Sequence, residues 1–556
     1  MYFAHDPTNN FYYLGDEEPS GALYRKYLLD SEPKIVGVDV ETISLKERIA
    51  IGVGIAVEPL KAFYFPLFPT ESPTVPWKLL RDPTILNIYH NGIFDLECLF
   101  EYDINTSIMD TNIMSRLLCN KFNGLSDLSW AHRMEVHEVR DILAEYNAKI
   151  MLDIPQEVVA RKCMQDAGAA LKLYQVFMPQ TNIPYFLKEM ETIPIMDSMS
   201  RRGLLLDHTV RMALEQELEG DVATYLTQCE DAESFNPASP QQVSWTLADR
   251  GAYSVFSKLP FTRNKYGRST GNLSSAKEVL EKMDDPLAQL ILRFREKSKL
   301  LSTYIKPWAD EDRAFTHFHL DAITGRPSST DRNMQNLPGA KTHASINCRG
   351  MIIPDSGTWT DWDFSQLELR ILAHVSQDRE MLYTYETGGD IHQIVADFMG
   401  IDRKIAKNVN FAMIYGGTDQ TLMETAHIRT IQTATRLRIM WFDLFREAGD
   451  YIQSIQRQSH YTNKAVTIYG REMRLPTEEE ENADAIERKA VNYPIQGSAA
   501  DILKRALIYC KDMDLALQVH DELLIDGIAM PNELEAIEHM APFHTPIDIK
   551  YLERWQ

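Results

Sequence analysis

Residues Leu515–Gly527 read LALQVHDELLIDG, with three consecutive polar residues between two apolar runs. Runs of this kind, alternating in parts, are typical of half-buried strands, so the stretch predicts two strands that meet at His520, Asp521 and Glu522. Two carboxylates at such a junction need water or a positive partner. The stretch alone therefore fits both a hairpin with a solvent-exposed polar turn and a metal site.

The bulk composition describes an ordinary globular protein of several domains. The chain has 556 residues, of which 44% are hydrophobic and 25% charged, and domains usually have about 100–200 residues. Its net charge of −23 argues against nucleic acid as a partner. Phosphate binding depends on local clusters of Lys and Arg, however, so the net charge does not exclude it.

Cysteine usage and hydropathy predict a location in the cytoplasm. The six cysteines are far apart and form no CxxC pair, which fits a reducing compartment and argues against structural zinc. The longest apolar run, IAIGVGIAV at residues 49–57, is too short to span a bilayer. The first twenty residues carry no signal or transit peptide pattern. We expect no membrane association.

The order of sequence patterns predicts three successive regions. Strand-like runs alternate with turns from about residue 33 to 70, and helical spacing then dominates to about residue 310. Strand patterns return near residues 357–364 and at 515–526, with helical spacing between them around 400–460. The chain therefore reads as α/β, then mostly helical, then α+β.

A first set of acids is spread over three elements. Asp39 and Glu41 are two apart on a predicted strand, VGVDVET, so both side chains leave the same face. Asp95 lies four residues after Asn91 on a predicted helix that starts after a strand, and Asp166 lies in an Ala-rich helix. Each acid alone fits a surface or capping residue. Together they could hold two divalent cations, which bind a phosphodiester and activate water.

A second set combines cations, aromatic rings and an acid. In DRKIAKNVNFAMIYGG, residues Arg403, Lys407, Phe411 and Tyr415 recur every four positions and so lie along one helical stripe. Asp402 is the expected N-cap, and Gly416–Gly417 the expected stop. A nucleotide explains this mixture, with cations for the triphosphate and rings for the sugar and base. A structural helix with snorkelling cations is the alternative.

Asp363 supplies the partner that Asp521 needs. It ends a strand-like run in WTDWDFSQLELRILAHVS, so the hairpin turn could hold Asp521 beside it. Two bare carboxylates about 4 Å apart repel by roughly 4 kcal/mol at an effective dielectric near 20. Two Mg²⁺ ions reverse that sign and assist attack on an α-phosphate.

The front segments resemble the three motifs of the DEDD 3′–5′ exonucleases, the proofreading domain of bacterial and phage DNA polymerases. The matching stretches are DVET, HNGIFD and QDAGAALKLY. The resemblance implies metal ligation by Asp39, Glu41, Asp95 and Asp166, with two Mg²⁺ ions bound. It departs at Lys162, where the family usually has a Tyr that orients the attacking water, so we expect hydrolysis at an altered rate.

From about residue 195 to the end, the chain resembles family A DNA polymerases, the DNA polymerase I type. The matching stretches occur in the family's order: TGRPSSTDRNMQNLP, DFSQLELRILAH, DIHQIVA, RKIAKNVNFAMIYGG, ERKAVNYPIQGSAADILKRA and QVHDELL. The implied fold is an α/β RNase H-like exonuclease domain followed by an α+β right-hand polymerase. The implied domains are exonuclease 1–190, thumb 191–315, palm 316–390, fingers 391–485 and a second palm segment 486–556.

The resemblance also implies a role for each matching residue. Asp363 and Asp521 would bind two Mg²⁺ ions, for which Mn²⁺ can substitute, with Glu522 as a catalytic acid beside them. Lys407 would also protonate pyrophosphate, Phe411 would pack on the nucleotide and disfavour dideoxynucleotides, and Glu368 would exclude a 2′-hydroxyl. The implied nucleotide-binding residues are Arg403, Lys407, Phe411, Tyr415, His392, Glu368 and Gln366. The implied DNA-binding residues are Arg326, Asn492, Gln496, His520, Arg488, Lys297 and Lys299.

A basic segment in the predicted thumb offers a surface for the duplex backbone. LRFREKSKLLSTYIK concentrates Arg293, Arg295, Lys297, Lys299 and Lys306, and an amphipathic structural helix is the alternative. The implied partners are primer–template DNA, deoxynucleoside triphosphates and replisome proteins, and we expect a monomer.

Three functions are compatible with these patterns: a proofreading DNA polymerase, a nuclease with a polymerase-like clamp, and a non-catalytic DNA-binding scaffold. The complete acid sets and the Arg403–Tyr415 stripe favour the first. Because the first strand-like run begins near residue 35, we expect no 5′-nuclease domain before it and no long thumb insertion between residues 200 and 310. That layout is typical of phage enzymes that work in the host cytoplasm.

Overall fold

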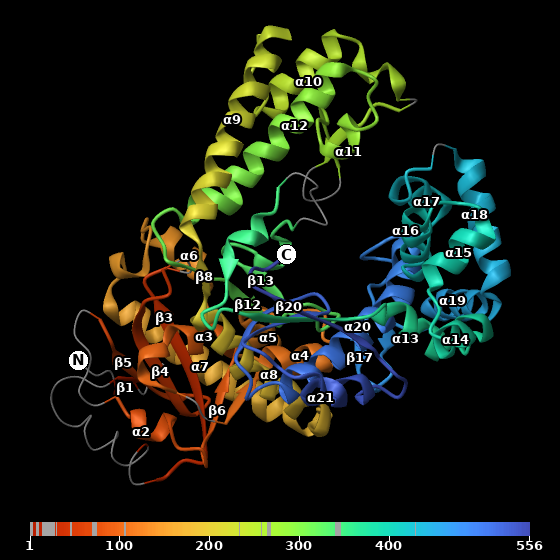
Figure 1. Cartoon of the computed structure of the whole chain (residues 1–556). Coiled ribbons are helices and arrows are strands. Elements are labelled where there is room, and N and C mark those ends of the chain that lie inside the picture. The colour runs from red at the N-terminus through yellow and green to blue at the C-terminus, as the bar shows by residue number, and fades with distance from the viewer. Residues whose placement is uncertain are drawn as a thin grey trace.

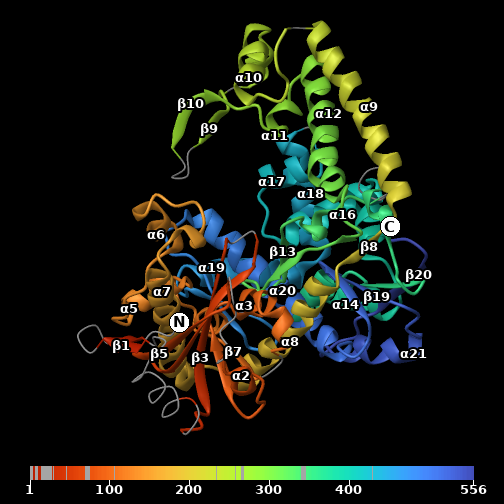
Figure 2. The same ribbon diagram turned by 90° about the vertical axis from the view of Figure 1, so that its left-hand side faces the viewer.

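The computed structural model shows a front domain and a central sheet, with two helical regions around them (Figures 1 and 2). In Figure 1, one helical arm rises at the top and a second helical group lies at the right. The described residues are 4–6, 11–13, 28, 31–44, 47–68, 75–104, 107–232, 234–256, 258–263, 268–339, 346–428 and 430–556.

The front domain is built on a mixed sheet of five strands in the order β5-β4-β3-β6-β7. Its central strand β3 pairs antiparallel with β4 and parallel with β6. Helix α7 lies across β3, β4 and β5, and it approaches so closely that a Cβ at Gly37 would lie 2.1 Å from the Ala167 carbonyl oxygen. The bounds are β3 Ile35–Thr42, β4 Ala50–Glu58, β5 Lys61–Pro66, β6 Leu86–Tyr89, β7 Ile108–Asp110 and α7 Gln156–Phe177.

Of the two short strands β6 and β7, β6 is the strand expected just before the helix of Asp95, whereas β7 lies where the sequence pattern predicted mainly helix. They have four and three residues and are largely buried. A strand this short shows too few positions for alternation to be recognised. The three longer strands, β3 to β5, lie where strands were predicted.

The central sheet has four antiparallel strands in the order β18-β19-β15-β20. Strands β18 and β19 form the predicted hairpin, and β15 is the predicted strand that carries Asp363. In the pairing of β15 with β19, Asp363 lies opposite Glu522. The bounds are β15 Trp359–Phe364, β18 Leu515–Val519, β19 Glu522–Asp526 and β20 Ile547–Leu552.

Two helical regions flank the central sheet. The upper arm packs α9 (His208–Ala232) along α12 (Pro286–Leu300). It has a hydrophobic core of its own around Val243, Leu280 and Ile291. The lateral group at the right of Figure 1 contains α15 Ile391–Met399, α16 Arg403–Ile414, α17 Asp419–Thr425, α18 Ile431–Leu444 and α19 Arg446–Ser459.

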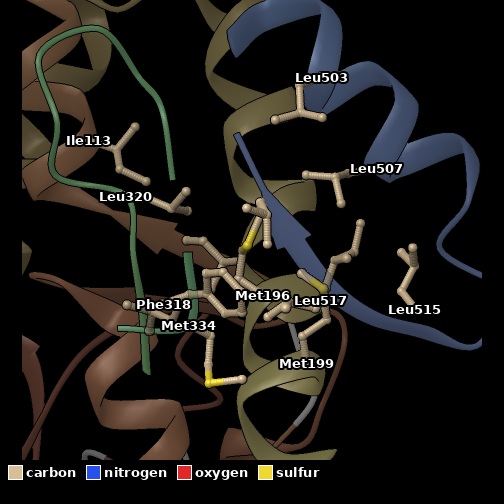
Figure 3. Close-up of a cluster of buried hydrophobic side chains, with 14 of the residues drawn as sticks. Ile113, Met196, Met199, Phe318, Leu320, Met334, Leu503, Leu507, Leu515 and Leu517 are labelled. Carbon is tan, nitrogen blue, oxygen red and sulfur yellow. The ribbon is translucent and has the colours of Figure 1, made fainter. Parts of the chain in front are cut away.

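The front domain and the central sheet share one continuous core, unlike the arm. Figure 3 shows buried side chains from both parts in contact around helix α8 (Ile183–Arg202). Helix α20 (Ala483–Tyr509) packs against α8 and adds Leu503 and Leu507 to this cluster. The predicted domain boundaries at 190/191 and 485/486 therefore fall inside helices α8 and α20.

Buried charges reinforce this junction. Lys504 Nζ lies 2.6 Å from Glu189 Oε2, and the Arg471 guanidinium lies 2.9 Å from Asp501 Oδ1. The Tyr185 hydroxyl oxygen lies 2.6 Å from a carboxylate oxygen of Glu189 and 2.6 Å from one of Asp501, which joins the two ion pairs. Breaking one such buried pair typically costs about 3–5 kcal/mol.

The described helices include none long and apolar enough to cross a membrane. All six cysteines are free thiols.

Candidate active sites

The hairpin turn places Asp521 beside Asp363 at one end of the central sheet. The backbone N–H of Phe364, next to Asp363, donates a 3.3 Å hydrogen bond to the carbonyl oxygen of Asp521. His520 adopts a left-handed φ of 54°, which closes the two-residue turn between β18 and β19. The structure therefore brings together the two acids that the sequence predicted to meet.

The electrostatics of this pair favour a divalent cation. Burial, followed by the nearby Asp521 and Glu522 carboxylates, raises the pKa of Asp363 to about 7. Burial also raises the pKa of Asp521 to about 6. Oδ1 of Asp363 is buried and has no hydrogen-bond partner among the described residues. Carboxylate oxygens are the ligands that Mg²⁺ prefers, so the donor set fits this ion.

Glu522 differs from the two aspartates because its oxygens are already engaged. Oε1 accepts a 2.7 Å hydrogen bond from Trp555 Nε1, and Oε2 lies 3.3 Å from Arg349 Nη1. The Arg349 guanidinium stacks over the Trp555 ring at 4.1 Å. The structure thus holds Glu522 next to the pair and gives it partners of its own, and its role as a catalytic acid stays a prediction.

Helix α16 presents the predicted stripe of cations and rings. Asp402 caps the helix by accepting a 2.7 Å hydrogen bond from Lys404 N. Lys407 Nζ lies 5.8 Å from the centroid of the Phe411 ring, which lies 6.1 Å from that of Tyr415. Tyr415 is the residue after the last helical turn rather than part of the helix.

Two of the predicted triphosphate ligands have internal partners. Arg403 Nη2 pairs with Asp390 Oδ2 at 2.6 Å, and Asp390 Oδ1 accepts a 3.4 Å hydrogen bond from Gln366 Nε2. His392 is buried, and its Nδ1 is 2.9 Å from Asn410 Nδ2. Burial lowers the pKa of His392 to about 4, so the imidazole is neutral and adds no charge to a phosphate site.

The residues predicted to select the sugar and to contact the primer end meet around Glu368. The Tyr415 hydroxyl donates a 2.5 Å hydrogen bond to Glu368 Oε2, and the Arg326 guanidinium pairs with Oε1. Gln496 is a further hydrogen-bond partner of Tyr415. Arg326 also lies near His520. Burial lowers the pKa of His520, and the positive charge of Arg326 lowers it further.

Asn492 and Arg488 are placed beside Gln496 by the geometry of helix α20. They precede it by four and eight residues on the same helix, so the three side chains share one face. The backbone of Arg488 lies next to Gly416, where an added Cβ would meet the Arg488 Cα at 3.3 Å. This face of α20 therefore adjoins the C-terminal end of α16.

The basic segment of the upper arm divides into two groups. Lys297 Nζ lies 2.7 Å from Asp221, and Lys306 Nζ lies 2.8 Å from Glu219, both on helix α9. Arg295 donates to the carbonyl oxygens of Pro237 and Ser275. The structure therefore gives Lys297 an internal partner, against the prediction that it grips DNA. Arg293 and Lys299 are exposed and line a cavity of about 860 Å³ that Tyr304 and Asn336 also border.

The four front acids converge beside a second cavity. Asp39 and Glu41 leave β3, Asp95 leaves α3 (Gly92–Cys98), and Asp166 leaves α7. Asp95 Oδ1 accepts a 3.0 Å hydrogen bond from the Val40 backbone, which fixes α3 against β3. Asp39, Glu41 and Asp95 line a cavity of about 640 Å³.

Lys162 lies within this acid cluster. Its Nζ is 2.8 Å from Glu41 Oε1 and 2.6 Å from Asp166 Oδ2, and all three side chains are buried. Burial lowers the pKa of Lys162, but Asp166 and Glu41 raise it further, so the ammonium stays charged. Burial raises the pKa of Asp39, and Asp166 adds to this effect. The buried oxygens Asp39 Oδ2 and Asp166 Oδ1 have no hydrogen-bond partner among the described residues, which fits a cation ligated there.

Sequence reasoning missed the partners that hold the predicted residues in place. Asp390 pairs with Arg403, Arg349 with Glu522, and Asn410 with His392. The contact of Lys162 with Asp166 was visible as an i,i+4 spacing in a predicted helix. The other pairs join distant segments and leave no local signal.

Comparisons with known proteins agree with this geometry. Residues 209–542 match the family model for DNA polymerase family A. The chain is 27% identical to DNA polymerase I of Pseudomonas aeruginosa over 554 residues, which cover 89% of this chain and 60% of that protein. It is 33% identical to DNA polymerase I of Deinococcus radiodurans over 357 residues, which cover 60% of this chain and 36% of that protein.

The fold likeness extends over almost the whole chain. The solved POL domain of Pol1 from M. smegmatis, in complex with DNA primer-template and dNTP, superposes with a TM-score of 0.75 at 23% identity. The superposition covers 98% of this chain and 99% of that one. The chain spans 60% or less of the length of the two curated relatives named above. Because the family model matches more than half of its residues, the chain belongs to DNA polymerase family A.

Proposed function

We propose that the chain synthesises DNA on a template from deoxynucleoside triphosphates and that its front domain, an RNase H-like exonuclease domain, removes nucleotides from the primer 3′ end. One observation carries the first part: Asp363 and Asp521 lie together beside the Glu368–Tyr415–Arg326 group. The convergence of Asp39, Glu41, Asp95 and Asp166 supports the second part. The likeness to a domain solved with DNA primer-template and dNTP supports these substrates.

The role proposed for each residue is the one that the resemblance to family A polymerases implies. Two Mg²⁺ ions, or Mn²⁺ in their place, would be held by Asp363 and Asp521 and would lower the barrier to attack of the primer hydroxyl on the α-phosphate. Arg403 and Lys407 bind the triphosphate, and Lys407 delivers a proton to the departing pyrophosphate. Phe411 packs on the sugar and base.

Selection of the nucleotide depends on the group around Glu368. Held by Tyr415 and Arg326, the Glu368 side chain occupies the space that a 2′-hydroxyl would need. Arg326, Asn492, Gln496 and His520 contact the minor groove near the primer end, where correct pairs present a common pattern of acceptors. Arg488 and Lys299 contact the DNA backbone.

One gel tests both activities. A 5′-labelled primer on a longer template is incubated with Mg²⁺, with and without deoxynucleoside triphosphates. We expect a ladder of longer products with the triphosphates and shorter products without them. Extension with no shortening would overturn the exonuclease assignment, and a primer that only shortens would overturn DNA synthesis. A role in phage replication in the host cytoplasm, together with replisome partners and a monomeric state, stays a prediction, and the relatives named above are bacterial.

A further inference from the structure

Lys162 occupies a position inside the front acid cluster that a cation would otherwise fill. Its ammonium bridges Glu41 and Asp166 at 2.8 Å and 2.6 Å, and the exposed fractions of the three side chains are 8% or less. It reaches this place from α7, one helical turn before Asp166. The bridge therefore joins β3 to α7 through a charged group that belongs to the chain.

The bridge leaves a smaller set of ligand atoms. One oxygen of Glu41 and one of Asp166 face the ammonium, and Asp95 Oδ1 accepts the Val40 N–H. The buried oxygens Asp39 Oδ2 and Asp166 Oδ1 have no hydrogen-bond partner among the described residues. Ligand atoms of Asp39, Glu41 and Cys163 also lie within 4.8 Å of one another, so the atoms left for an ion gather around Asp39.

The charge of the cluster permits a single ion. One ammonium and one divalent ion leave a net charge of −1 with four carboxylates, whereas two divalent ions would leave +1. A second divalent ion would place three cations together where little water screens their repulsion. An ammonium also supplies charge and hydrogen bonds but has no coordination position for a water molecule.

We propose that Lys162 takes the place of one divalent ion, so that the front cluster binds a single divalent cation at Asp39. This inference rests on the proposed exonuclease function of the cluster. It replaces the sequence-based expectation of two Mg²⁺ ions at this site. In this nuclease site, one cation is the ammonium group of Lys162 and the other is a divalent ion bound from solution.

A count of bound Mn²⁺ tests the inference independently of activity. The full chain carrying D363N and D521N, which removes the ligands of the palm site, is titrated with Mn²⁺ and the free ion is measured by electron paramagnetic resonance. We expect one Mn²⁺ per chain with Lys162 present and two with K162M, a twofold change. The titration is repeated with a single-stranded oligonucleotide ending in a phosphorothioate, because phosphate oxygens complete the ligand shell of such ions.

Two further variants serve as controls. K172M makes the same change ten residues further along α7, outside the cluster, and should leave one bound Mn²⁺. K162Y provides a polar replacement if melting curves show that K162M does not fold. Two Mn²⁺ ions bound with Lys162 present would overturn the inference while leaving a metal-dependent nuclease site. No Mn²⁺ bound with or without Lys162 would overturn the proposed exonuclease function as well.

Discussion

The palm acids and the front acids balance the same kind of charge in different ways. Asp363 and Asp521 lie on a strand end and a hairpin turn, and neither has an ion-pair partner among the described residues. The cations that act on them, Lys550 and Arg326, pair instead with Asp361 and Glu368. The front cluster contains its own ammonium, Lys162. Without metal, the palm pair must hold protons or repel, whereas the front cluster is already partly neutralised. The first site depends on ions from solution more than the second does.

The largest expected effect is the loss of DNA synthesis in D363N. Because this change removes a metal ligand, we expect the rate of single-nucleotide addition to fall by about 10³-fold, which corresponds to several kcal/mol. Primer shortening without triphosphates should stay at the level of the unchanged chain. D39N is the matched control, with extension retained and shortening lost. Loss of both activities in either variant would show that the two sites do not act separately.

The next effect is on the free energy of unfolding, which should change differently at the front acid cluster and at the palm acids. In K162M without divalent ions at pH 8, Glu41 and Asp166 lose their buried partner, so the free energy of unfolding should fall by about 3 kcal/mol. D363N should be neutral or stabilising, because it relieves repulsion with Asp521. Urea unfolding measures both, with K172M as the control. Equal unfolding midpoints for K162M and K172M would contradict a stabilising role for the ammonium.

A smaller effect is the release of protons when the palm site binds Mg²⁺. Because the pKa of Asp363 is raised to about 7, its carboxyl is partly protonated at pH 7 in the metal-free chain. Metal binding should then release about half a proton per chain at pH 7, and affinity should increase from about pH 6 to 8. Calorimetry of a D39N/D95N chain in buffers of different ionisation enthalpy measures this release. The same release in a chain that also carries D363N would contradict the assignment to Asp363.

The raised pKa of Asp363 also fixes the direction of a stability change. The folded metal-free chain binds more protons than the unfolded chain between the ordinary value of 3.8 and about 7. Stability conferred by this group is therefore present at low pH and is lost as the pH increases through that window.

The smallest expected effect extends the comparison to the upper arm. Lys297 is neutralised by Asp221, as Lys162 is by its carboxylates, whereas Lys299 is exposed beside the large cavity. K299A should lower affinity for primer–template about threefold. It should also reduce the salt slope, which is the slope of log affinity against log salt concentration, by about 1. K297A should leave the salt slope unchanged. Fluorescence anisotropy at several salt concentrations measures the salt slope of each variant. Equal slopes for K299A and K297A would contradict the different roles of Lys299 and Lys297.

Local patterns predicted most of the elements and the meeting of the palm acids. The apolar runs in VGVDVET and LALQVHDELLIDG correspond to β3 and to the β18–β19 hairpin, whose strands are buried along nearly their whole length. The four-residue spacing in α16 likewise aligned Arg403, Lys407 and Phe411. Asp363 and Asp521 could be paired because both stood at strand ends.

What the sequence could not supply was the partner of each charged group. Whether Lys297 faces DNA or Asp221 depends on how α9 and α12 pack, and the spacing within one helix contains no such information. Glu522 resembled a free acid because Arg349 and Trp555 come from distant segments. The domain boundaries were misplaced because α8 and α20 are continuous helices that belong to both of their neighbours.

Helix α8, which both parts share, limits where the chain can be cut into separate domains. Its residue Glu189 pairs with Lys504 of α20, and its residues Met196 and Met199 pack in the cluster of Figure 3. A cut at residue 190 would interrupt the helix and separate Glu189 from its partner. An exchange of the front domain between relatives would therefore have to carry all of α8 and its matching face of α20. The front domain and the central sheet share one core, whereas the upper arm has a core of its own that could be exchanged separately.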